Sequence, residues 1–306
     1  MTKKTHIAGI LFASIFGFSF LFSKIALNYV TPIGLIAYRF LIAFITFEIL
    51  RLAKLVRVKI DKSQLKYLGI VALFQPILYF LFETFGLNLV SSGEAGMMIA
   101  LIPIFVAILS AFIIKERPNP IQVLFIFISV IGVIIIQLSK TSGNTDSEFL
   151  GFILLLLAVI SAALFNIASR TASTKGLKPL EVTYFMMLFG ALMFNIIYLI
   201  QLSVEKRITD YISNLFHIEL LVPILYLGII ASIGGFFLVN LVLSKVPAHV
   251  SSIYANLSTI VAIIAGVFLL DEKITYYHVV GSILIIVGVY GTVRLNRIPK
   301  RFKSKN

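Results

Sequence analysis

Residues 92–135, SGEAGMMIALIPIFVAILSAFIIKERPNPIQVLFIFISVIGVII, align without a gap with residues 248–291, AHVSSIYANLSTIVAIIAGVFLLDEKITYYHVVGSILIIVGVYG. The shift is 156 residues, and it superposes one acid and one glycine of each copy, Glu116 on Glu272 and Gly132 on Gly288. Apolar helices often align by chance, but here an acid and a glycine fall in the same register. We therefore interpret the match as an internal duplication.

The composition of the chain is that of a membrane protein. Of its 306 residues, 59% are hydrophobic and only 13% are charged, and the mean hydropathy is +1.04. A soluble globular chain has roughly a quarter of its residues charged. The composition therefore excludes a soluble enzyme and predicts a multi-pass protein of the cytoplasmic membrane.

A helix needs about 20 apolar residues to cross the bilayer. Ten stretches approach that length, at residues 7–27, 34–53, 67–90, 93–114, 119–139, 149–169, 180–201, 219–243, 248–270 and 274–295. No stretch alternates polar and apolar residues with a period of two, so we expect an all-α fold rather than a barrel.

The duplication divides these ten helices into two halves. We expect a first five-helix repeat at residues 1–140, a second at 149–295 and a basic cytoplasmic tail at 296–306. Because five is odd, the second half enters the membrane from the side opposite to the first, which makes the repeat inverted. Inverted repeats are typical of carriers, whose halves rock about a central site.

Positive charge predicts the orientation. If the N-terminus is cytoplasmic, 20 of the 26 lysines and arginines fall on the cytoplasmic side and four fall outside. Basic residues favour the cytoplasmic side of membrane proteins, so both termini are expected there. The net charge of +13 is thereby explained without nucleic acid as a partner, and the basic tail is expected to contact anionic lipid headgroups.

Several motifs resemble a known family. The stretches LIPIFVAILSAFIIKE (101–116) and LSTIVAIIAGVFLLDE (257–272) each end in an acid, and glycine-containing helices with VIGVIII (130–136) and IVGVYG (286–291) follow. Together with TPIGLIAYRFLIA (31–43), these stretches resemble the EamA-type carriers of the drug/metabolite transporter superfamily. The resemblance covers nearly the whole chain and implies transport of amino acids, nucleobases or other small metabolites. One departure is that Met186 or a neighbour occupies the position of Arg39 in the second half.

Three ionisable residues are predicted at one depth inside the membrane. Lys24 lies about three residues, or about 4.5 Å, from the outer end of its helix, and Arg39 and Glu83 lie about five residues, or about 7.5 Å, from theirs. Charges at such depths are costly and are candidates for function. Our hypothesis is that Glu83 pairs with Arg39 near Lys24 and that the cluster binds a charged substrate group or gates the pathway. The alternative is that both cations snorkel to the headgroups and Glu83 is a static partner.

Other candidates for the substrate-binding or gating site are uncharged. Interhelical hydrogen bonding is the default role of a polar side chain within a membrane helix. Asn166 and Asn240 are nevertheless candidates, because they fall at or beside the positions of Lys24 and Glu83 in the second half, and Asn256 lies on a helix expected to line the pathway. Aromatic side chains that are candidates to line a cavity include Tyr79, Tyr184 and Tyr254.

Some polar residues are assigned structural roles. Glu116 and Glu272 lie in the tight turns of the repeat, where we expect them to cap a helix or to pair with neighbouring basic residues. Glu48 lies within reach of Arg51 and Lys54 and is expected to form a surface ion pair. Pro76, Pro103 and Pro223 fall inside predicted helices and are expected to kink them.

The predicted function is a secondary transporter that exports a small organic metabolite, an amino acid or similar, by alternating access. Glu83 is the candidate group for a coupled proton or ion. The alternative is an intramembrane enzyme or a lipid flippase acting on a lipid-linked substrate. An enzyme is not expected, because the four histidines show no metal-binding spacing, no cysteine is present and no phosphate-binding loop occurs. No cofactor or metal is predicted, and the residues indicate neither the substrate nor the oligomeric state.

Overall fold

The computed structural model describes residues 3–59, 61–90, 95, 98–137, 146–261, 264 and 275–295, and every regular element within them is helical. The first half contains α1 (Lys3–Leu27), α2 (Pro32–Leu52), α3 (Leu65–Ala72), α4 (Tyr79–Leu89), α6 (Ile102–Ile113) and α7 (Pro120–Gln137). The second half contains α8 (Asp146–Thr174), α9 (Pro179–Val204), α10 (Asp210–Ser213), α11 (Ile218–Leu225), α12 (Phe236–Lys245), α13 (Ala248–Ser252) and α15 (Tyr276–Arg294). The all-α expectation is confirmed for the described part of the chain.

Seven helical segments of the described residues are long and apolar enough to cross a membrane. They are Lys3–Leu27, Pro32–Leu52, Lys62–Leu89, Phe149–Thr174, Pro179–Val204, Ile218–Lys245 and Tyr276–Arg294. Two shorter apolar helices, Ile102–Ile113 and Pro120–Ile136, fall within the expected crossings at 93–114 and 119–139. The remaining expected crossing, 248–270, extends beyond the described residues, as does the turn that contains Glu272.

Local sequence signals set the starts of two long helices. The Thr31 side chain accepts a hydrogen bond from the Gly34 N–H at 3.3 Å, and Pro32 occupies the first turn of α2. Pro179 likewise begins α9, where the Glu181 carboxylate accepts from the Lys178 N–H at 2.9 Å. Proline is favoured at this position because the N–H that it lacks would have no partner within the helix.

The third crossing of each half is interrupted in its middle. A π-helical segment, η2 (Leu73–Leu78), joins α3 to α4, and Gln75 within it has extended backbone angles, with φ −151° and ψ 117°. In the second half a π-helical segment, η4 (Tyr226–Gly235), joins α11 to α12. Pro76 lies within the first interruption, as expected of a kinking proline. Pro103 instead lies in the first turn of α6 and so begins that helix.

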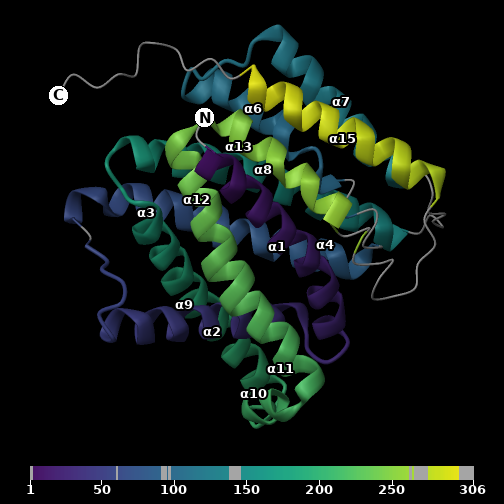
Figure 1. The fold of residues 1–306 in the computed structure, drawn as a ribbon. Helices are drawn as coiled ribbons and strands as arrows, with labels where there is room; N and C mark the ends of the chain where they lie inside the picture. Colours follow the sequence, from purple (N-terminus) through teal and green to yellow (C-terminus); the bar gives the residue numbers. More distant parts are fainter. Residues whose placement is uncertain are drawn as a thin grey trace.

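The helices pack as pairs drawn from both halves. α7 lies along α15, α2 lies along α9, α4 packs on α8, and α1 packs on η4 and α12 (Figure 1). Each of these contacts joins segments that are far apart in the sequence. The two halves therefore share one buried interior rather than forming separate cores.

The pair α7 and α15 is held at very short range by glycines. A Cβ atom added at Gly132 would lie 2.6 Å from the Gly281 carbonyl oxygen, and one added at Gly288 would lie 2.6 Å from the Phe125 carbonyl oxygen. No side chain fits at either place without moving a backbone. Small residues allow such close approach between membrane helices, which increases their van der Waals contact.

We predict that Gly132→Ala destabilises the protein by about 1–3 kcal/mol, the usual cost of overpacking a tight contact. The matched control is Gly69→Ala in α3, because a Cβ at Gly69 meets nothing within 4 Å. Alanine there is expected to leave stability unchanged or to raise it, since alanine favours helix over glycine. Thermal unfolding of both variants in detergent measures the difference, and equal midpoints would contradict the close contact.

Candidate functional site

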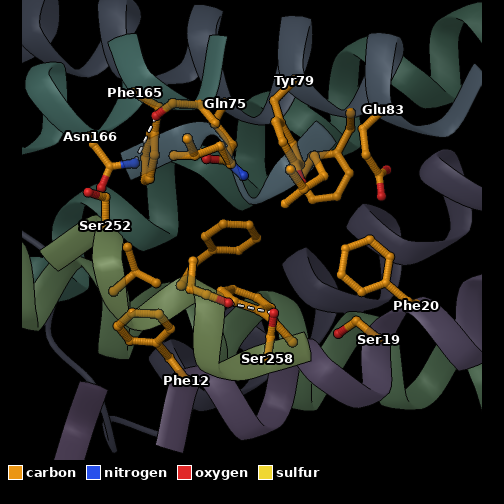
Figure 2. A pocket seen from close by; sticks show the side chains of 18 of the residues that line it. Phe12, Ser19, Phe20, Gln75, Tyr79, Glu83, Phe165, Asn166, Ser252 and Ser258 are labelled. Atoms are coloured by element: carbon orange, nitrogen blue, oxygen red, sulfur yellow. Dashed lines mark hydrogen bonds between the residues drawn. The ribbon is translucent and has the colours of Figure 1, made fainter. Parts of the chain in front are cut away.

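A cavity of about 110 Å³ lies in the interior of the helix bundle (Figure 2). Its walls come from α1, α2, η2, α4, α8, α12 and the α13 region, so both halves contribute. Four of the predicted site residues line it, namely Arg39, Tyr79, Glu83 and Asn166. These four residues come from three helices, α2, α4 and α8, and the fold brings them to one cavity.

Aromatic rings form much of the cavity wall. The Phe236 ring lies 5.3 Å from Phe16, 5.9 Å from Phe80 and 6.2 Å from Phe165, measured between ring centroids. Phe12 continues the wall, 6.0 Å from Phe16. Edge and tilted contacts of this kind are favourable between phenyl rings and hold them in place. The wall is thus an ordered apolar surface between two polar ends.

One end of the cavity carries both signs of charge. Arg39 and Glu83 are only 6% and 8% exposed, and they are near enough for Coulombic attraction. They do not form the direct ion pair that we expected, because no N–O distance of 4 Å or less joins them. Arg39 Nε instead donates to Ser232 Oγ at 2.8 Å, and its guanidinium lies 4.5 Å from the centre of the Phe80 ring. Glu83 accepts from Thr84 Oγ1 at 3.1 Å.

The position of Arg39 depends on a close helix contact. A Cβ at Gly228 in η4 would lie 2.9 Å from the Arg39 carbonyl oxygen. The bare glycine therefore lets α2 approach η4 at the level of the arginine. Ser232 lies about one turn further along η4, where its hydroxyl accepts a hydrogen bond from Arg39 Nε and donates one to the Leu227 carbonyl at 2.8 Å.

Lys24 does not line the cavity and has a different partner from the one expected. Its ammonium donates to the Leu87 carbonyl at 3.1 Å and to the Val90 carbonyl at 3.5 Å. These groups lie at the C-terminal end of α4, where the last carbonyls have no partner within the helix. A cation is favoured at that end of a helix dipole. Lys24 therefore caps α4, the helix that carries Glu83.

The other end of the cavity is polar without charge. Asn166 and Ser252 lie together there, far from Glu83 across the cavity, and Gln75 points into the space between them and Tyr79 (Figure 2). Asn166 Nδ2 donates to the Ala162 carbonyl of its own helix at 2.8 Å. Ser251 also lines the cavity, and its buried hydroxyl has no hydrogen-bond partner among the described residues.

The other predicted site residues lie outside this cavity. Asn240 accepts from Ser169 Oγ at 2.6 Å and donates to Thr183 Oγ1 at 3.0 Å, which links α12 to α8 and α9. Asn256 donates to Ser129 Oγ of α7 at 3.1 Å. These two asparagines have the interhelical role that is the default for such residues.

Tyr184 and Tyr254 also belong to other clusters. The Tyr184 hydroxyl donates to Glu48 Oε1, and Glu48 is paired with Arg51, so this cluster lies at the far end of α2 from the cavity charges. The Tyr254 hydroxyl is 2.8 Å from His6 Nδ1, although its ring packs at 6.1 Å against the cavity residue Phe12. Tyr254 therefore lies behind the cavity wall rather than in it.

The small hydroxyl residues of the cavity are not among the residues predicted from the sequence. Ser19 and Ser23 of α1 line it four residues apart, and Ser251 and Ser258 line it as well. A four-residue spacing of serines in an apolar helix is a weak signal, since it puts two hydroxyls on one face. Serine is small enough to serve equally well in helix packing, so the spacing alone does not distinguish the two roles.

Glu116 connects parts of the chain that are far apart in sequence. Its carboxylate accepts from Arg170 Nε of α8 at 2.9 Å and from the Ala248 N–H at the start of α13 at 3.0 Å. Arg170 also donates to the Leu243 carbonyl of α12 at 3.0 Å. We had expected local capping or pairing within the turn. The structure shows instead that Glu116 joins the two halves.

Long apolar helices around an interior cavity with aromatic and charged walls are the architecture expected of a multi-pass membrane transporter. The sequence profile of the EamA-like transporter family matches residues 3–138 and, separately, residues 149–294. The chain therefore belongs to the EamA-like transporter family, and it is a multi-pass protein of the cell membrane. The resemblance seen in the sequence motifs is confirmed.

Relatives carry transporter names. An uncharacterized transporter of Bacillus subtilis (strain 168), YcxC, is 36% identical over 97% of this chain and 95% of its own length. A probable amino-acid metabolite efflux pump of Escherichia coli (strain K12) is 24% identical over 95% of both chains. A solved crystal structure aligns with this chain over 100% of both chains, with a TM-score of 0.74 and 19% sequence identity. This likeness shows that the two proteins share a fold. The family and these names indicate a transporter rather than an enzyme.

We predict that Arg39 and Glu83 are energetically coupled although they do not touch. Each single change, Arg39→Gln or Glu83→Gln, leaves the other charge buried without its neighbour, so each destabilises the protein. The double variant is expected to lose less than the sum, by about 0.5–3 kcal/mol. Unfolding in mixed detergent micelles gives the four free energies of the cycle. Additive losses would show that the two charges act independently.

Proposed function

We propose that this protein is a secondary carrier that exports an amino acid or a similar small organic metabolite across the cytoplasmic membrane by alternating access. The observation that carries the proposal is that Arg39 and Glu83 share one end of the cavity without a direct ion pair. A zwitterion presents a carboxylate and an ammonium group close together. Arg39 is suited to the carboxylate and Glu83 to the ammonium group.

The remaining cavity wall suits the rest of such a molecule. The phenyl rings of Phe16, Phe80 and Phe236 provide apolar surface beside the charges. The Ser251 hydroxyl, which has no hydrogen-bond partner among the described residues, provides further hydrogen-bonding capacity in the cavity. A pocket with apolar walls and a few directed polar groups is typical of small-molecule sites. The name of the Escherichia coli relative, an amino-acid metabolite efflux pump, is consistent with this substrate class and with export.

The proposal includes two inverted five-helix repeats. It is supported by reciprocal contacts: shifting by 156 residues takes Gly132 to 288 and Phe125 to 281, so the contact of Gly132 with Gly281 becomes that of Gly288 with Phe125. Both contacts occur between α7 and α15. In the same way, α1 packs on η4 and α12, while α8, the corresponding first helix of the second half, packs on η2 and α4. Such an exchange of partners is what a pseudo-twofold axis produces.

Alternating access requires a closure at each side of the cavity. We propose that Glu116, Arg170 and the start of α13 form the cytoplasmic closure, because their contacts join the two halves. The ion pair is partly buried, with side chains 12% and 13% exposed. Its opening would free the turn between α6 and α7 to move relative to α8 and α13. The assignment to the cytoplasmic side follows from the distribution of basic residues.

We predict that Glu83→Gln abolishes redistribution of the exported metabolite while leaving the protein folded, because a neutral amide cannot neutralise an ammonium group. Cells with equal membrane levels of wild type and variant are compared by untargeted mass spectrometry of the metabolites inside and outside. The matched control is Glu48→Gln, since Glu48 lies outside the cavity. The control is expected to export as the wild type does.

Export by the Glu83 variant equal to that of the wild type would contradict a role of this residue in binding. The same cells under an imposed pH gradient test coupling to protons. Wild-type export that follows the gradient supports proton coupling, with Glu83 as the group that exchanges the proton. Export that is insensitive to the gradient would remove the proton from the mechanism and leave another ion or simple exchange.

We predict that cysteines at positions 117 and 273 react from opposite sides of the membrane. Arg117→Cys and Lys273→Cys occupy equivalent positions of the two repeat turns, 156 residues apart, and Lys273 lies outside the described residues. The chain has no cysteine of its own, so each label reports one site. A membrane-impermeant maleimide added to intact cells should label position 273, and position 117 only after the membrane is permeabilised. Labelling of both from one side would contradict the inverted repeat.

A further inference from the structure

A second hollow lies on the outside of the bundle, separate from the central cavity. It has a volume of about 550 Å³ and lies between the start of α1 and the end of α15, with η5 (Ile253–Asn256) at its base. Figure 1 shows the start of α1 and the C-terminal end of α15 at the same end of the bundle. We name this hollow the α1/α15 groove.

The α1/α15 groove is apolar along most of its length. Its apolar lining comprises Ile10, Leu257, Ile286, Val289 and Val293. Ile10 and Ile286 are 53% and 55% exposed, which is unfavourable in water but not in a membrane. These helices belong to membrane-crossing segments, so the groove opens toward lipid. Its natural content is therefore hydrocarbon.

The end of the α1/α15 groove is cationic. Arg294 lines it, with the guanidinium 5.5 Å from the Tyr290 ring and hydrogen-bonded to the hydroxyl of that residue. No carboxylate lines the groove, and none of the ion pairs formed by the described residues includes Arg294. Lys3 and Lys4, at the start of α1, are exposed at the same end. An arginine with no acidic partner among the described residues, at the same end of the bundle as two lysines, attracts an anion.

We infer that the α1/α15 groove binds one anionic phospholipid, with its phosphate at Arg294 and an acyl chain along the apolar lining. The charge selects an acidic headgroup, because a basic residue near a membrane surface attracts anionic lipid by about 1 kcal/mol. The apolar length selects a lipid over a soluble phosphate, which would leave the groove unfilled. Neither feature depends on the transported substrate, so the inference stands apart from the proposed function.

The residues at the base of the groove pack against the wall of the central cavity. Tyr254 lines the groove, bonds to His6 and packs against Phe12, which lines the cavity on the other side. A Cβ added at Gly9 would lie 2.7 Å from the Tyr254 ring, so α1 is pressed against this tyrosine. A lipid in the groove therefore supports the wall that separates the cavity from the bilayer, and we expect it to stabilise the packing of α1.

The test measures lipid binding to the purified full chain by native mass spectrometry, with phosphatidylglycerol and phosphatidylcholine as probes. The wild type is expected to retain one phosphatidylglycerol in preference to phosphatidylcholine. Arg294→Gln is expected to weaken that binding about fivefold, whereas Arg294→Lys, which keeps the charge, retains most of it. The matched control is Arg207→Gln, an exposed arginine far from the groove, which should bind as the wild type does.

A second measurement distinguishes binding of the whole lipid from binding of its phosphate headgroup alone. In a neutral detergent, added long-chain phosphatidylglycerol should raise the midpoint temperature of thermal unfolding of the wild type. This increase should be lost in Arg294→Gln. Equal protection by inorganic phosphate or by a short-chain lipid would overturn the inference in favour of a simple anion site. The inference would also be overturned if Arg294→Gln and Arg294→Lys bound the lipid equally, or if the wild type showed no preference for the acidic lipid. Occupation of the groove by a second copy of the chain would overturn it as well.

Discussion

The structure depends on one constraint, that backbone N–H and C=O groups inside a bilayer must find their partners within the protein. Long helices meet the constraint by themselves, and for this reason every regular element of the described residues is helical. A break in a helix is tolerable only where protein or a polar cavity surrounds the freed groups. The extended residue Gln75 obeys this condition, because it is 5% exposed and borders the central cavity. The break in the helix therefore places the side-chain amide of Gln75 at the cavity wall.

Close helix contact is the second requirement, and it follows from the first. Helices surrounded by lipid gain little from the hydrophobic effect, so they associate through packing between small residues and through polar side chains. Gly228 shows how such packing positions the site. It allows η4 to lie against the backbone of Arg39, so that the Ser232 hydroxyl can accept a hydrogen bond from the arginine side chain. Lys24 contributes indirectly, because it caps the helix that carries Glu83. The charges are therefore held by contacts that lie mostly outside the cavity.

The sequence predicted which stretches form apolar helices better than the direction in which their side chains point. The scarcity of charge in these stretches singled out Arg39 and Glu83, both of which line the cavity. Asn240 and Tyr184 point elsewhere. Helices that are apolar on every side carry no stripe that marks their inner face, so direction is set by packing. The Glu116 and Arg170 pair was missed for a related reason, since its partners are brought together only by the tertiary fold.

The separation of Arg39 and Glu83 bears on how a substrate could drive a conformational change. A closed ion pair would have to be broken before either charge bound a ligand, and an isolated buried charge would destabilise the resting protein. Here each charge has a neutral partner, Ser232 or Thr84, and feels the other only at a distance. Both therefore retain electrostatic free energy that a zwitterion can release on binding. A ligand shifts a conformational equilibrium only by the difference between its affinities for the two states. If the two charges move relative to each other when the halves rock, a molecule that bridges them distinguishes the two states, whereas one that meets a single charge does not.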